Sequence, residues 1–177
     1  MSEIAAALES VGFATFLPHR DGLEFRPLLR TLQSRGIEQD RATVFWNQAI
    51  FALDAFSVLV DSQALVLNMN GRVPDEGAVA EASMAWCAGK VVVGYKTDVR
   101  SLVLGQDNAM ISGLIDFGTV STPAQAARRV SELLNASGAP AATPSNKYLD
   151  LGAAISAALQ EDSLEKVADV VLVFAGN

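Results

Sequence analysis

Residues 64–81 read ALVLNMNGRVPDEGAVAE, and this stretch decides the fold of the chain. The apolar run at 64–69 is typical of a strand buried on both faces, and the asparagine and glycine after it are turn residues. Small residues at 76–88 predict a helix that packs closely, and VVVGY at 91–95 predicts a second buried strand. Strands that alternate with helices indicate an α/β fold with a mostly parallel sheet.

The remaining segments extend this pattern over a single domain of residues 1–177. Gly36 suits the C-terminus of a helix, and Thr122-Pro123-Ala124-Gln125 has the N-cap, proline and capping-box glutamine that start one. The run ASGAPAATPSN at 136–146 is the best candidate for a linker. Further helices are expected at 3–10, 27–35, 40–60, 123–134 and 147–160, and further strands at 13–18 and 169–176.

The composition argues against several classes of function. The 177 residues are 50% hydrophobic and 19% charged, which argues against disorder, and the net charge of −7 argues against nucleic acid and anionic membranes as partners. A single cysteine, Cys87, and a single histidine, His19, argue against a disulfide, a zinc cluster and a Ser-His-Asp triad. The N-terminus has no signal-peptide pattern and no apolar stretch is long enough for a bilayer span, so we expect a soluble, cytoplasmic protein.

Three carboxylates are the candidates for chemistry. Asp75 precedes a predicted helix, so it is either an N-cap or an active-site group. Glu81 has apolar neighbours in that helix and is either a solvated position or a buried carboxylate, which needs a partner or a function. Asp54 interrupts an apolar-rich helix and is costly there unless it is paired or functional. Carboxylates between a parallel strand and the following helix lie where open α/β sheets bind ligands, which predicts a carboxylate-based active site.

Six motifs follow one another in a recognisable order along residues 12–135. They are PHRDG (18–22), Asp54, DSQALVLNMNG (61–71), DEGAVAE (75–81), GKVVVGYKTDVR (89–100) and NAM (108–110). Their order and spacing resemble the nucleoside 2-deoxyribosyltransferase family. The pattern of that family has P-x-R-D, a helical Asp, a hydrophobic run ending in D-G, D-x-G-T-A-x-E, G-K-x-V, D-x-R and N-x-M.

The resemblance implies a flavodoxin-like parallel sheet with helices on both faces. It implies that Glu81 is the nucleophile that attacks the anomeric carbon of a 2-deoxyribosyl group, and that Asp75 and Asp54 bind and protonate the nucleobase. Asn108 and Met110 match a segment that reaches into the site of a neighbouring subunit, which implies a homo-oligomer with shared active sites. The partners implied are a nucleoside or nucleotide and a free nucleobase, and no metal or organic cofactor is implied.

The chain departs from the family pattern in three places. The family begins with a strand that lines the substrate pocket, whereas this chain begins with SEIAAALESVG. We hypothesise that residues 170–176 fill the slot of that strand, as in a circular permutation, with Phe174 at its aromatic position. Ser83 replaces a glycine two residues after the nucleophile, and Ala78 replaces a threonine.

Three functions remain open. The first is transfer of 2-deoxyribose between nucleobases through a covalent glutamyl intermediate. The second is hydrolysis of the N-glycosidic bond of a nucleoside or deoxynucleotide, in which His19, Arg20 and Arg72 are candidates to bind a phosphate. The third is a nucleoside-binding homologue without catalysis. Asp98 and Arg100, at the D-x-R motif, are expected to form a structural ion pair.

Overall fold

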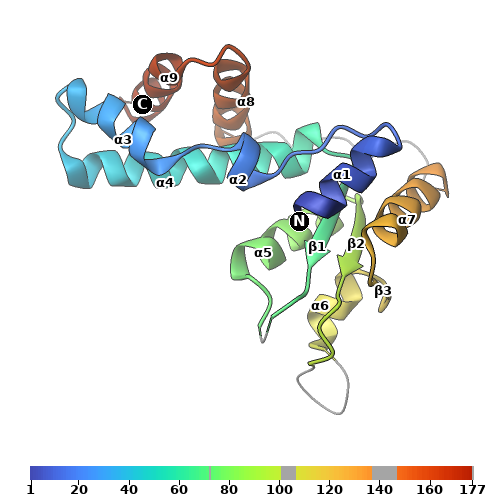
Figure 1. The fold of residues 1–177 in the computed structure, drawn as a ribbon. Helices are drawn as coiled ribbons and strands as arrows, with labels where there is room; N and C mark the ends of the chain where they lie inside the picture. Colours follow the sequence, from blue (N-terminus) through green and yellow to red (C-terminus); the bar gives the residue numbers. More distant parts are fainter. Residues whose placement is uncertain (72, 101–106, 137–146, 177) are drawn as a thin grey trace. The chain divides into compact units, whose positions relative to one another are not determined.

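The computed structural model describes residues 1–71, 73–100, 107–136 and 147–176 (Figure 1). Its residues group into two compact units, each made of two separate stretches of the chain. The α/β unit comprises Met1–Thr15 and Ser62–Thr143, and the helical unit comprises Phe16–Asp61 and Pro144–Asn177. The single domain that we expected over residues 1–177 thus contains two centres of packing.

A parallel sheet forms the centre of the α/β unit. Its strands are β1 (Ala64–Asn68), β2 (Val91–Tyr95) and β3 (Thr119–Val120), in the spatial order β1-β2-β3. β1 pairs with β2 along its whole length, whereas β3 pairs only with the last two residues of β2. The strands predicted at 64–69 and 91–95, and the α/β class with a parallel sheet, are confirmed.

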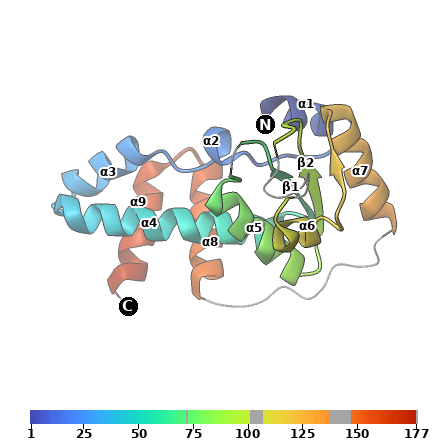
Figure 2. The same ribbon diagram turned by 90° about the horizontal axis from the view of Figure 1, so that it is seen from below.

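Helices lie on both faces of this sheet (Figure 2). On one face are α1 (Ser2–Ser10) and α7 (Pro123–Ala136), which contact each other, and on the other are α5 (Glu76–Cys87) and α6 (Ala109–Leu114). Alternate residues of a strand point to opposite faces, so Val91 and Val93 both pack into the apolar cluster of α1 and α7. The small residues Ala82 and Ala85 of α5 are buried, as their pattern predicts.

The helical unit is held together by one apolar core. Its elements are α2 (Pro18–Asp21), α3 (Phe25–Ser34), α4 (Gln39–Phe56), the π-helical turn η1 (Ser57–Asp61), α8 (Lys147–Gln160) and α9 (Leu164–Gly176). α4 contacts α3, α8 and α9. The largest fully buried side chains of this core are Leu28, Leu32, Leu53, Ile155, Val167 and Val171.

α4 and α8 approach each other most closely at Gly152. A Cβ atom on Gly152 would overlap the carbonyl oxygen of Ala52 and the Cβ atom of Phe56. The first of these is backbone, which cannot move aside unless the two helices separate. Glycine at this position therefore sets the distance between the helices.

The helices expected from the sequence are present. Those predicted at 3–10, 27–35, 40–60, 76–88, 123–134 and 147–160 correspond to α1, α3, α4 with η1, α5, α7 and α8, with ends that differ by a few residues. The linker predicted at 136–146 lies outside the described residues, apart from Ala136, which ends α7. The strand predicted at 13–18 is wrong, because 13–17 have no regular structure and Pro18 begins α2.

The strand predicted at 169–176 is also wrong, because these residues belong to α9. Val167, Ala168 and Val171 are buried in the core of the helical unit, at the three- and four-residue spacing of one helix face. The β-branched run that suggested a strand is therefore helical, with Val171 buried and Val173 exposed.

The hypothesis of a circular permutation fails for the same reason. Residues 170–176 do not fill the slot of a strand, and Phe174 is a partly buried residue of α9 that packs against the core of the helical unit. Phe174 therefore does not belong to a strand of the sheet.

One helical stretch, Gln39–Asp61, is long and apolar enough to cross a membrane, by length and composition only. This differs from our expectation that no stretch would be. The stretch contributes Phe45, Ala49 and Leu53 to the buried core of the helical unit, and a core helix of this kind passes the same test.

Candidate functional site

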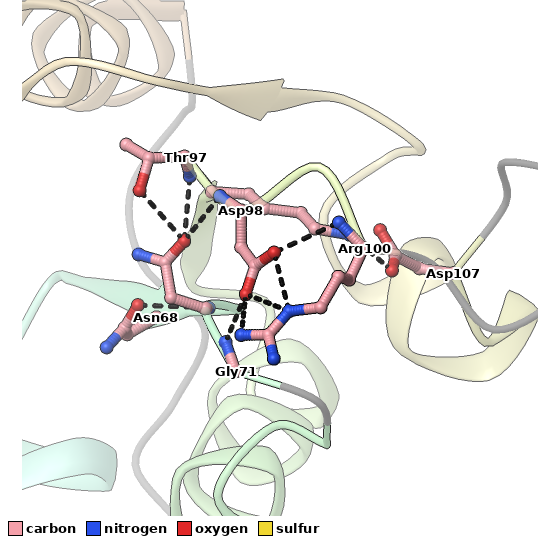
Figure 3. Close-up of polar contacts among 8 residues, drawn as sticks. Asn68, Gly71, Thr97, Asp98, Arg100 and Asp107 are labelled. Carbon is pink, nitrogen blue, oxygen red and sulfur yellow. Dashed lines mark hydrogen bonds and ion pairs between the residues drawn. The ribbon is translucent and has the colours of Figure 1, made fainter.

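Hydrogen bonds, together called the lock, join two loops at the carboxyl end of the sheet (Figure 3). One loop follows β1 and the other follows β2. Asn70 Oδ1 accepts hydrogen bonds from Thr97 N at 2.8 Å, from Thr97 Oγ1 at 3.1 Å and from Asp98 N at 2.9 Å. In return, Asp98 Oδ2 accepts a hydrogen bond from Gly71 N at 3.3 Å. Each loop therefore binds the backbone of the other with a side chain, at the edge where open α/β sheets bind ligands.

Asp98 and Arg100 form the ion pair expected from the sequence. Arg100 Nε lies 2.9 Å from Oδ1 and 2.8 Å from Oδ2 of Asp98, and Arg100 Nη2 also donates to Oδ2. This hydrogen-bonded guanidinium, aided by the backbone N–H groups of Arg100 and Gly71, holds the pKa of Asp98 far below its usual range. Asp98 stays ionised and is suited to hold the loop rather than to supply a proton.

A second ion pair holds the start of α6. Lys96 Nζ lies 2.5 Å from Asp107 Oδ1, and the Lys96 side chain is 11% exposed. Lys96 directly follows β2 and donates its backbone N–H to Val120 O at 2.8 Å, so the pair ties α6 to the sheet. Asn108 caps α6 by accepting a hydrogen bond from Met110 N at 2.9 Å, and Met110 is 81% exposed. The Asn108–Met110 segment is therefore anchored at its base and presents Met110 to solvent.

Asp75 is the N-cap of α5, as one of its two interpretations predicts. Its Oδ1 accepts a hydrogen bond from Ala78 N at 2.9 Å, and the residue is exposed. The cap uses one carboxylate oxygen, so it is compatible with a catalytic role for the other.

Glu81 is half-buried in the second turn of α5. The six-residue step from Asp75 to Glu81 corresponds to about 9 Å along a helix axis. Ser83, which replaces the family's glycine, donates its hydroxyl to Val79 O at 2.8 Å. The Ser83 hydroxyl therefore makes its hydrogen bond to the backbone of the helix to which Ser83 belongs.

Asp54 lies in the helical unit, whereas Asp75, Glu81, Asn108 and Met110 lie in the α/β unit. Asp54 is half-buried on α4, between the buried residues Leu53 and Ala55. Burial raises the pKa of its carboxyl group. The structure thus brings four of the six predicted site residues into one unit and leaves Asp54 and Phe174 in the other.

A pocket of about 550 Å³ in the α/β unit does not include any predicted site residue. It lies beside the part of β2 that β3 does not pair with. Its walls come from α5, α6, α7, β2 and β3, and include Trp86, Lys90, Val91, Ile115, Asp116, Arg129 and Leu133.

The roles of Asn70 and of the Lys96–Asp107 pair were not predicted from the sequence. A usable signal was present, because polar residues directly follow both buried strands, in NMNG (68–71) and KTD (96–98). In a parallel sheet such residues share one edge. Which side chain would bind which backbone was not readable from that pattern.

Among the residues that the structure describes, no three His, Cys, Asp or Glu side chains are grouped to hold a metal ion. Comparison of the chain with protein-family models, with curated proteins and with solved structures found no match.

Proposed function

We propose that this chain transfers a 2-deoxyribosyl group between nucleobases, with Glu81 as the nucleophile and Asp75 as the acid and base. One observation carries the proposal: Asp75 caps α5 and Glu81 lies in its second turn, and α5 is the helix that follows the loop at the carboxyl end of β1. The parallel sheet with helices on both faces supports a flavodoxin-like arrangement, in which that edge is the usual place for a ligand.

The proposed reaction has two displacements at one carbon. A carboxylate oxygen of Glu81 bonds to the anomeric carbon, the bond to the base nitrogen breaks, and the leaving base takes its proton from Asp75. A second base then gives a proton to Asp75, attacks the anomeric carbon and releases Glu81. Configuration is retained because each displacement inverts it once.

The resemblance also assigns Asp54 to the nucleobase side, but Asp54 belongs to the helical unit and the proposal does not use it. Asn108 and Met110 are the candidates for contact with a neighbouring subunit, since Met110 is exposed and its segment is anchored. The chain would then work as a homo-oligomer with shared sites.

Hydrolysis of the N-glycosidic bond is the second candidate function. The exposure of Asp75 favours it, because water reaches an exposed carboxylate as readily as a second base does. Arg20 and Asp21 form an ion pair on the exposed helix α2, so Arg20 is engaged with a carboxylate. Arg72, the other arginine considered for a phosphate, lies outside the described residues.

Incubation of the protein with deoxyinosine and free adenine tests the proposal. A transferase yields deoxyadenosine and hypoxanthine, and its yield rises with the adenine concentration. A hydrolase yields hypoxanthine and free deoxyribose at a rate that adenine does not raise. Deoxyinosine that remains intact, at any adenine concentration, would refute both functions.

A further inference from the structure

Asn70 makes hydrogen bonds that join the two loops, but it uses only the oxygen of its side-chain amide for them. An asparagine offers one acceptor oxygen and an NH₂ group with two donors, whereas a carboxylate offers only acceptors.

The orientation of the Asn70 amide is fixed by its partners. The backbone N–H groups of Thr97 and Asp98 are donors only, so the atom they approach at 2.8 and 2.9 Å is the oxygen. The hydroxyl of Thr97 makes a third bond to the same oxygen. The oxygen is therefore saturated, and no acceptor is recorded for Asn70 Nδ2 among residues 1–71, 73–100, 107–136 and 147–176.

The position of Asn70 makes that donor useful. Asn70 is the second residue after β1, at the carboxyl end of the parallel sheet, and α5 with Asp75 and Glu81 follows it. The residue is half-buried, so its amide is held by the fold and still reaches solvent. A donor that is fixed in place before binding loses little entropy when a ligand arrives.

We propose that Asn70 Nδ2 is a substrate-binding donor of this edge, and that it takes an acceptor oxygen or nitrogen of a 2-deoxynucleoside. The inference rests on the proposed function and adds a specificity residue to it. Asparagine at this position selects an acceptor on the ligand, whereas aspartate would repel that same atom.

The variant Asn70→Asp separates the two halves of the side chain. A carboxylate oxygen still accepts the three bonds of the lock, while the NH₂ donor becomes a second acceptor. Asn68→Asp is the matched control for charge, because Asn68 Oδ1 accepts a hydrogen bond from Asn70 N at 3.2 Å and its carboxylate would do the same. Thr97→Val is the control for the lock, because it removes one bond to Asn70 and leaves the donor intact.

The dissociation constant for deoxyinosine and its rate of cleavage are measured for the wild type and the three variants. Amide hydrogen exchange at Thr97 and Asp98 reports the lock in the same samples. We expect Asn70→Asp to weaken deoxyinosine binding by about tenfold or more, with the Thr97 and Asp98 amides still protected. Asn68→Asp and Thr97→Val should bind within about threefold of the wild type, a difference below 1 kcal/mol.

Three results would overturn the inference alone, in a wild type that binds deoxyinosine. They are equal binding by Asn70→Asp and Asn68→Asp, a loss in Thr97→Val as large as in Asn70→Asp, and lost amide protection in Asn70→Asp. A wild-type protein that neither binds nor cleaves deoxyinosine would overturn the proposed function together with the inference.

Discussion

Glu81 is the residue on which the proposed chemistry depends. We predict that Glu81→Gln lowers the rate of deoxyinosine cleavage by about 1,000-fold or more, because an amide does not act as the nucleophile. Glu76→Gln is the matched control, since Glu76 lies in the first turn of the same helix and is exposed. Steady-state rates of the two variants decide the matter. Comparable rates for Glu81→Gln and Glu76→Gln would exclude Glu81 as the nucleophile.

Asp54 gives a prediction that links pH and stability. Burial raises its pKa in the folded protein, so in the window above its ordinary value of 3.8 the folded state keeps a proton that the unfolded state has released. The free energy of unfolding therefore decreases as the pH rises through that window, because folding then keeps the Asp54 proton bound. It stays lower at neutral pH.

The variant Asp54→Asn tests this argument. We expect it to raise the Tm at pH 7 by about 1–3 °C and to leave the Tm at pH 3 nearly unchanged. Thermal unfolding at both pH values is the measurement. A lower Tm of Asp54→Asn at pH 7 would contradict the desolvation argument.

At the scale of single residues, the sequence predicted contacts between near neighbours in the chain better than contacts between distant residues. The cap role of Asp75 and the Asp98–Arg100 pair were readable, because both depend on neighbours within three positions in the chain. The bonds of Asn70 to Thr97 and Asp98 span 27 and 28 positions. They depend on the register of β1 and β2, which a pattern of apolar residues does not specify.

At the scale of elements, the crossing of α4 and α8 is the most sensitive feature of the helical unit. We predict that Gly152→Ala destabilises the protein by about 1–3 kcal/mol, because the new methyl group overlaps the backbone of Ala52. Gly176→Ala is the control, since a Cβ there meets nothing within 4 Å. Urea unfolding of both variants measures the difference. Equal stability of the two would show that the helices separate freely.

Two different physical causes explain the elements that the sequence misjudged. A short apolar run does not distinguish a strand from one face of a helix, and α9 was misread because its valines suit either. The buried positions Val167 and Val171 are four apart, and the helical core that buries them comes from distant parts of the chain. Residues 13–17 failed as a strand for the opposite reason, since composition alone does not supply a neighbouring strand to pair with.

At the scale of the whole molecule, the exposed end of α6 predicts an assembly. We expect the protein to be a homo-oligomer in solution, and Met110→Lys to shift it toward the monomer, because a charge replaces an apolar side chain that is 81% exposed in the single chain. Val99→Lys is the control for an apolar residue that is even more exposed, at 96%. Light scattering coupled to size exclusion gives the masses. A wild type that is monomeric at all concentrations would contradict the prediction.

The class of the fold was predictable, and its division was not. Strands at 64–69 and 91–95 with a helix between them were enough to predict a parallel α/β arrangement. The division into two units was hidden because each unit is made of two stretches that lie far apart in the sequence. Sequence order carries little information about which distant helices share a core.

This division has a consequence for the protein during its synthesis. The α/β unit has all of its residues once position 143 is made, whereas the helical unit must wait for the C-terminus. α4 ends at Phe56 and its partner α8 begins at Lys147, so about 90 residues are translated before the two can meet. At ordinary elongation speeds the apolar side of α4 waits for about 5–20 s. Until α8 and α9 are made, α4 has only α3 and η1 of the helical unit to pack against.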